Sequence, residues 1–296
     1  MLSFRRRRAH SFPGRLAGAV AAAVVFAALS STPPAQAQSA DDEATQAPAE
    51  RPAPASDIDC SGLPDHRALA AALKKIVTPG DTETNGGLGN NMWAAVVDRS
   101  GAVCAVAHSG DSFDAQWPGS RAIAASKAFT ANAFSLKGFA LSTANLFWPS
   151  MPRNSLYGLE TSNPIRPEAV YRGPATSWGT EADPIVGQRI GGITLFAGGL
   201  ALYTPKGDLI GGLGLSGDQS CTDHVIAWKV RHTLNLDNVP KGVSPDGDDN
   251  IIYDLSVDPG SGQTKSASGY GHPTCSPGAT EIAKNFPSTF PTGPEE

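Results

Sequence analysis

Apolar residues recur at helical spacing in three stretches of the chain. We predict helices at residues 64–77, 121–137 and 222–236. Ser120 is a candidate N-cap for the second helix, and Gly138 is a candidate residue just beyond its C-terminus. The expected buried stripe of the third helix consists of Ile226, Ala227, Val230 and Leu234.

Four short apolar runs between these helices predict strands. The first two, Met92–Val97 and Ala102–Ala107, flank an Asp-Arg-Ser-Gly turn, and Thr194–Tyr203 and Asp208–Ser216 flank a Pro-Lys-Gly turn. Strands that arrive as hairpins favour an antiparallel sheet. We therefore predict an α+β fold, with a sheet of two hairpins and helices packed on it.

The connection at residues 141–192 is too long for an ordinary loop. It contains many prolines and glycines together with Phe147, Trp148, Tyr157, Tyr171 and Trp178. A segment of this composition must pack on something to stay ordered. A lid over a pocket, an oligomer contact and a structural cover for the sheet are all open interpretations.

The N-terminus has the features of a secretory signal peptide, with five arginines, an alanine-rich apolar run and an Ala-Gln-Ala cleavage site ending at Ala37. We predict a signal peptide at 1–37, a disordered acidic linker at 38–57, one domain at 58–275 and a flexible tail at 276–296. The expected location is the periplasm or outside the cell, by general secretion or the twin-arginine route, with no stable membrane insertion after cleavage.

Cleavage after Ala37 leaves 18 basic against 28 acidic residues, a net charge of −10. This charge disfavours nucleic acid as a partner. The cysteines lie in the exported part, at Cys60, Cys104, Cys221 and Cys275, and an even count there suggests two disulfides. Three pairings are possible. The expected positions of the elements favour Cys60 with Cys104 and Cys221 with Cys275.

The segment Gly211–Arg231 combines a glycine-rich strand, a Ser216-Gly217-Asp218 turn and the start of a helix. Glycine within a strand marks the close approach of a ligand or of another backbone, so a ligand site and tight helix-on-sheet packing are both open. Its match to G-x-G-x-x-G does not indicate a dinucleotide site, because the strand closes an antiparallel hairpin rather than a βαβ unit.

Several side chains are candidates for binding chemistry. Lys127 and Thr130 share one face of an otherwise apolar helix, where they suit an anionic group, although a lysine at the edge of the core gives the same pattern. His108 and His224 are possible haem or metal ligands, and a polar cap or surface position is the alternative for each. The group Asp246, Asp248 and Asn250 favours a solvated acidic turn over a calcium loop, because no glycine or glutamate completes the calcium pattern.

Three local patterns together resemble the GlcG/HbpS-type haem-binding family, a domain also found in PduO-like proteins. They are the strand pair AAVVDRSGAVCAVAHSGD, the helix segment SKAFTA and the closing run GLGLSGDQSCTDHVIA. The resemblance implies an α/β sandwich around an antiparallel sheet, a homo-oligomer, and haem or another small cofactor. Positions that match the family's pattern are Asp98, Lys127, Thr130, Ser216, Gly217 and Asp223. The long aromatic loop, the cysteines and His108 depart from it.

Three functions follow as hypotheses. The first is an exported protein that binds a small molecule, haem or a related tetrapyrrole, without catalysis. The second is an enzyme acting on a small organic acid, with Lys127 and either Asp98 or Asp223 as an acid/base pair. The third is a structural or partner-binding module of the cell envelope.

Overall fold

The computed structural model describes residues 57–293. The predicted signal peptide and all of the predicted linker except Asp57 lie outside the described residues. Within the described range, no helix has the length and apolar character needed to cross a membrane.

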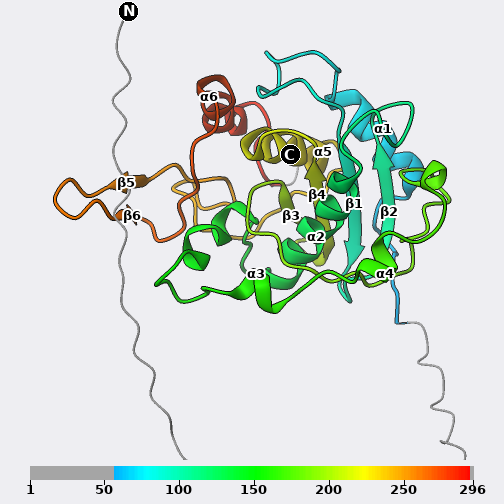
Figure 1. The fold of residues 1–296 in the computed structure, drawn as a ribbon, viewed down its shortest axis with the longest axis horizontal. Helices are drawn as coiled ribbons and strands as arrows, with labels where there is room; N and C mark the ends of the chain where they lie inside the picture. The colour runs from blue at the N-terminus through cyan, green and yellow to red at the C-terminus, as the bar shows by residue number, and fades with distance from the viewer. Residues whose placement is uncertain (1–56, 294–296) are drawn as a thin grey trace, which may run out of the picture. The chain divides into compact units, whose positions relative to one another are not determined.

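The centre of the fold is a four-stranded antiparallel sheet in the order β2-β1-β4-β3 (Figure 1). Its strands are β1 (Trp93–Asp98), β2 (Val103–His108), β3 (Gly199–Tyr203) and β4 (Leu209–Ser216). The predicted α+β fold of two hairpins is confirmed. Strand β3 begins five residues later than predicted. Before it, the Thr194 and Ala197 amides donate to the side chains of Thr130 and Ser220 rather than to a neighbouring strand.

Helices cover both faces of this sheet, which agrees with the burial of successive residues along β1 and β2. Helices α1 (His66–Ile76) and α5 (Ser220–Thr233) pack on one face, and α2 (Gly119–Phe134) packs on the other. Helix α1 is capped by Asp65, whose carboxylate accepts from the Ala68 amide at 2.8 Å. Ser120 is not the cap of α2, because the helix already begins at Gly119. Helix α5 is buried all round between Cys221 and Arg231, rather than along one stripe.

The glycines of β4 let α2 approach the sheet closely. A side chain at Gly212 would overlap the carbonyl oxygen of Ala128, and one at Gly214 would overlap that of Ala124. Gly199 on β3 has the same relation to the carbonyl of Lys127. Of the two interpretations of the glycine-rich strand, tight helix-on-sheet packing therefore explains these positions.

The long connection folds into short helical turns that cover the α2 side of the sheet (Figure 1). These are η1 (Ala144–Leu146), η2 (Trp148–Ser150), α3 (Leu159–Ser162), α4 (Pro167–Val170) and η3 (Ala175–Ser177). A buried ion pair anchors this connection to α2. The Arg121 guanidinium of α2 binds both carboxylate oxygens of Asp183, and Arg121 Nε lies 2.8 Å from Asp183 Oδ2. The segment is thus a structural cover over much of its length.

The C-terminal part differs from the flexible tail that we predicted. After the hairpin of β5 (Leu255–Val257) and β6 (Thr264–Ser266), residues 277–288 form α6 (Pro277–Asn285) and η4 (Phe286–Ser288). Phe286 is buried edge-on against Trp228, with ring centroids 5.2 Å apart, and the Trp228 indole N–H donates to the Phe290 carbonyl at 2.7 Å. This apolar contact with α5 holds the segment in the folded body.

Both predicted disulfides are confirmed, Cys60–Cys104 and Cys221–Cys275. The first ties the chain before α1 to β2. The second ties the start of α5 to the chain before α6. Each therefore joins segments that are more than 40 residues apart in sequence.

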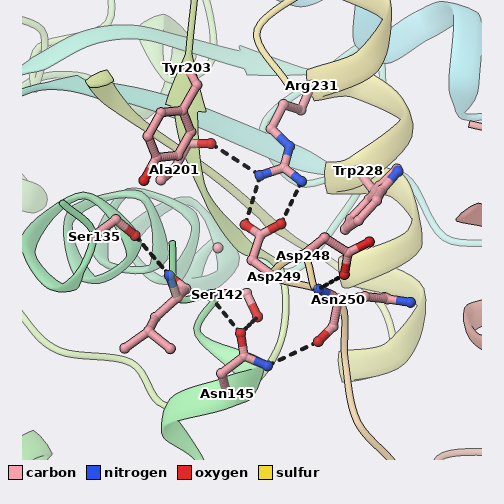
Figure 2. Close-up of polar contacts among 12 residues, drawn as sticks. Ser135, Ser142, Asn145, Ala201, Tyr203, Trp228, Arg231, Asp248, Asp249 and Asn250 are labelled. Carbon is pink, nitrogen blue, oxygen red and sulfur yellow. Dashed lines mark hydrogen bonds and ion pairs between the residues drawn. The ribbon is translucent and has the colours of Figure 1, made fainter. Parts of the chain in front are cut away.

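The predicted solvated acidic turn holds for Asp246, which is exposed, but is wrong for Asp248 and Asn250, which are buried within a network of polar contacts (Figure 2). The prediction did not include Arg231 of α5 as a partner of this turn. Arg231 binds both carboxylate oxygens of Asp249, at 2.7 and 2.8 Å. The same guanidinium donates to the Ala201 carbonyl of β3 at 3.2 Å. Asn145 of η1 donates to the Asn250 carbonyl at 2.9 Å, so the turn joins α5, the sheet and the long connection.

Candidate functional site

Lys127 and Asp223 form a buried ion pair that links the helices on the two faces of the sheet. The Lys127 Nζ lies 2.6 Å from Asp223 Oδ2 and also donates to the Leu215 carbonyl at 3.0 Å. A Cβ at Gly198 would lie 2.9 Å from Lys127 Nζ and 2.8 Å from the Asp223 Cβ, so this glycine leaves the space that the pair occupies. Gly198 directly precedes the edge strand β3, and the lysine passes this strand end to reach α5.

Burial dominates the electrostatics of this pair. It raises the pKa of Asp223 to about 6, although the charge of Lys127 and the Asp218 amide both oppose that shift. Burial also lowers the pKa of Lys127, against the attraction of Asp223. The two groups satisfy each other's charge inside the protein, and the lysine has no free face for an external anion.

The other predicted residues near this pair make internal hydrogen bonds. Thr130 donates to the Ser126 carbonyl at 2.8 Å and accepts from the Thr194 amide at 3.0 Å. The turn of residues 216–218 packs against residues 88–91, and the Asp218 carboxylate accepts from the Leu88 and Asn90 amides. This corner is filled by the protein itself.

Asp98 lies apart from these residues, at the opposite end of β1 from the Ser216 pairing. Its carboxylate accepts from the Asp59 amide at 2.8 Å, the Ser100 hydroxyl at 2.8 Å and the Ala102 amide at 2.9 Å. Asp98 therefore closes the β1–β2 turn and fixes the segment before α1. The structure does not bring it together with Lys127.

The two histidines proposed as ligands lie in different surroundings. His108 stacks on Trp93, with ring centroids 4.3 Å apart, and its Nε2 has no hydrogen-bond partner among the described residues. His224 is fully buried beside Trp228 and Phe286, and bonds Asn250 at 3.1 Å. Burial lowers both pKa values, that of His224 to about 3.

Sequence reasoning missed a buried serine–histidine contact at the start of α5. The His272 Nδ1 lies 2.7 Å from the Pro273 carbonyl and must donate to it, so its Nε2 accepts from the Ser220 hydroxyl at 3.0 Å. The Ser220 oxygen in turn accepts from the Ala197 amide at 2.8 Å. Burial lowers the pKa of His272 to about 4. These bonds tie three segments together beside the Cys221–Cys275 disulfide.

A cavity with aromatic and apolar walls lies between the long connection and the β5–β6 hairpin. It has a volume of about 600 Å³ and is lined by Phe147, Trp148, Met151, Pro152, Arg153, Leu255, Gln263, Thr264 and Pro273. Ligand pockets are typically lined by apolar and aromatic side chains with a few polar groups. Of the predicted site residues, none lines this cavity, and the aromatic composition of residues 141–192 was the one sequence signal for it.

Metal binding by a cluster of side chains has no support in the described residues. No group of three or more histidine, cysteine, aspartate or glutamate side chains among residues 57–293 is arranged to hold a metal ion.

Comparisons with known proteins place the chain in a family. Three solved structures are similar to parts of it, with TM-scores of 0.36–0.38: a PduOC:haem complex, the Klebsiella pneumoniae protein ORFY and HbpS. Their identities are 24%, 23% and 20%, over 57%, 57% and 60% of this chain and 88%, 86% and 94% of theirs. No curated protein matches. The model of the family described as "Haem degrading protein HbpS-like" matches residues 68–231, more than half of the chain, and the protein therefore belongs to the HbpS-like family.

Proposed function

We propose that this protein is exported and binds haem or a related tetrapyrrole without catalysing a reaction. The observation that carries the proposal is the cavity of about 600 Å³ with aromatic walls in a chain of the HbpS-like family. One of the similar solved structures is a PduOC:haem complex.

The side chains at this cavity fit a haem. The two faces of a haem are apolar, and Phe147, Trp148 and Leu255 offer apolar contact area at the cavity. The propionates of a haem are anionic. Arg153 is the charged residue among the described residues that line the cavity, and its guanidinium suits a carboxylate. Bound haem would supply an iron centre, and this chain would orient the ring and limit the access of water to it.

Export and assembly are part of the same proposal. Two disulfides among the described residues favour an oxidising compartment, which agrees with the predicted signal peptide. The family resemblance supports a homo-oligomer. The enzyme hypothesis has less support, because Lys127 is neutralised by Asp223 and lies away from Asp98. The structural-module hypothesis accounts for the filled Ser216–Asp218 corner but not for the cavity.

Titration of the mature protein with haemin tests the proposal. We expect a saturable, shifted Soret band with a defined stoichiometry. Native mass spectrometry of protein purified from the periplasm or culture medium measures the ligand mass and the subunit number together. A spectrum that stays that of free haemin would reject haem binding.

A matched pair of variants connects binding to the cavity. Trp148→Ala shortens a wall residue, whereas Trp117→Ala removes an exposed tryptophan that does not line it. We expect roughly tenfold weaker haemin binding for the first variant, equivalent to about 1.4 kcal/mol, and no change for the second. Equal affinities would place the ligand elsewhere on the protein.

A further inference from the structure

We propose that Met151 ligates the haem iron and that Arg153 binds a haem propionate, on one turn at the edge of the 600 Å³ cavity. This inference rests on the proposed haem-binding function. It assigns the iron ligand to a thioether on the long connection, rather than to either histidine suggested by the sequence.

Among residues 57–293, Met151 holds the thioether sulfur placed for this role. The sequence contains three methionines, of which Met1 belongs to the predicted signal peptide. Met92 precedes β1 and is fully buried in the core on the α1 and α5 side. Met151 is partly exposed and lines both the large cavity and a second cavity of about 340 Å³. A thioether is an established axial ligand of haem iron.

The turn that carries these residues has an unusual backbone. The Asn154 amide donates to the Met151 carbonyl at 3.0 Å, which closes a four-residue turn with Pro152 in second place and Arg153 in third. Arg153 has φ +75°, in the left-handed region. A turn with this third position normally uses glycine or asparagine there, because a larger side chain is strained. Arg153 therefore occupies this position at a conformational cost, and the residue lines the cavity.

The charge of the protein gives this arginine a specific role. The predicted mature chain has a net charge of −10 from 18 basic and 28 acidic residues, which opposes a dianionic ligand. Arg153 places a guanidinium at the cavity, where the described lining holds no carboxylate. A planar guanidinium matches the geometry of a propionate.

The histidines are less suitable as iron ligands. The His224 side chain is enclosed in the core beside Trp228 and Phe286. His108 stacks on Trp93 and lines a separate cavity of about 200 Å³. His272 packs against Phe147, which lines the large cavity, but its Nε2 already accepts from Ser220.

The experiment compares the haem complexes of the full mature protein and its variants. Met151→Leu keeps the apolar volume and removes the sulfur, and Met92→Leu is the matched control. We expect the ferric wild type and Met92→Leu to show the near-infrared charge-transfer signal of a thioether–iron bond by magnetic circular dichroism. We expect Met151→Leu to bind haemin, lose that signal and have a lower reduction potential.

Arg153→Gln and Arg172→Gln form the second matched pair, because both residues are exposed arginines of the long connection. We expect about tenfold weaker haemin binding for Arg153→Gln and no change for Arg172→Gln. Arg153→Gly relieves the left-handed backbone, so its melting temperature should equal or exceed that of the wild type while its affinity falls.

The outcomes separate this inference from the proposed function. If the wild type binds no haemin, the proposed function fails. If the wild type binds haemin but lacks the thioether signal, the ligand assignment is wrong. The assignment is also wrong if Met151→Leu keeps that signal. A loss of the signal in His272→Gln, with Met151→Leu unchanged, would transfer the assignment to His272. Unchanged affinity in Arg153→Gln would overturn the propionate contact.

Discussion

At the residue scale, Lys127 shows how a partner from a distant element changes the role of a side chain. Its place on an apolar helix face suited an external anion. The structure supplies an internal anion, Asp223, from a helix on the other face of the sheet. A charge buried this deeply is stable only with a partner. The pair therefore stabilises the arrangement of α2 and α5 rather than presenting a charge to a ligand.

A double-mutant cycle tests this role. Removing one member of a buried pair leaves an uncompensated charge, so we expect Lys127→Met and Asp223→Leu each to lower the free energy of unfolding by about 3–5 kcal/mol. The double variant should lose much less than the sum of the two. The measurement is urea unfolding at neutral pH. Additive losses would show that the two side chains act independently.

The close packing of α2 on β4 leads to a second prediction at single residues. Gly214→Ala places a methyl group against the Ala124 carbonyl and should cost about 1–3 kcal/mol or more. Gly138→Ala is the matched control, because its added Cβ meets nothing within 4 Å and its φ is not left-handed. We expect that control to change stability by less than about 0.5 kcal/mol in the same urea assay. Equal effects would contradict the packing explanation.

At the element scale, α6 shows the limit of composition as a guide. A segment with several prolines suggested flexibility, but apolar residues at Ala279, Ala283 and Phe286 pack on the core. Proline at the first turn of α6 is compatible with a helix, because the missing N–H has no intrahelical partner there. The contact with Trp228 on α5 was not evident from either segment by itself.

Phe286→Ala tests whether this segment stabilises the fold. Removal of a buried aromatic ring typically costs about 3–5 kcal/mol, and we expect that loss together with a red shift of tryptophan fluorescence from Trp228. Leu136→Ala, at an exposed position, should change stability by less than about 0.5 kcal/mol. A neutral effect of Phe286→Ala would contradict the packing of this segment and support the flexible tail predicted from the sequence.

At the scale of the whole molecule, three buried groups with large pKa shifts contribute to a pH dependence. The pKa of His224 falls to about 3 and that of His272 to about 4, because burial disfavours their charged forms. Below pH 6.5, the unfolded chain therefore binds protons at both sites that the folded chain does not. Asp223 acts in the opposite direction, because burial raises its pKa to about 6 and the folded state holds that proton more tightly.

Stability should therefore fall as the pH is lowered. Between about pH 6 and 4, the two histidines and Asp223 leave one net extra proton on the unfolded chain, a slope of about 1.4 kcal/mol per pH unit. The free energy of unfolding in urea, measured at several pH values, checks this slope. His272→Gln should reduce the contribution of these groups to the slope to nearly zero between about pH 6 and 4. An unchanged slope in the variant would show that His272 is protonated in the folded state.

The order of elements, the antiparallel hairpins and both disulfide pairs followed from the sequence, because they depend on hydrophobic periodicity, turn residues and the ends of predicted strands. Periodicity is local, and it reports which side of an element is apolar. It does not report which distant side chain meets a charged residue. The partners of Lys127, Arg121 and Arg231 come from segments 18 to 96 residues away, and only the tertiary structure could identify them. The cavity beside Met151 and Arg153 likewise exists only where a loop and a hairpin distant in sequence pack together.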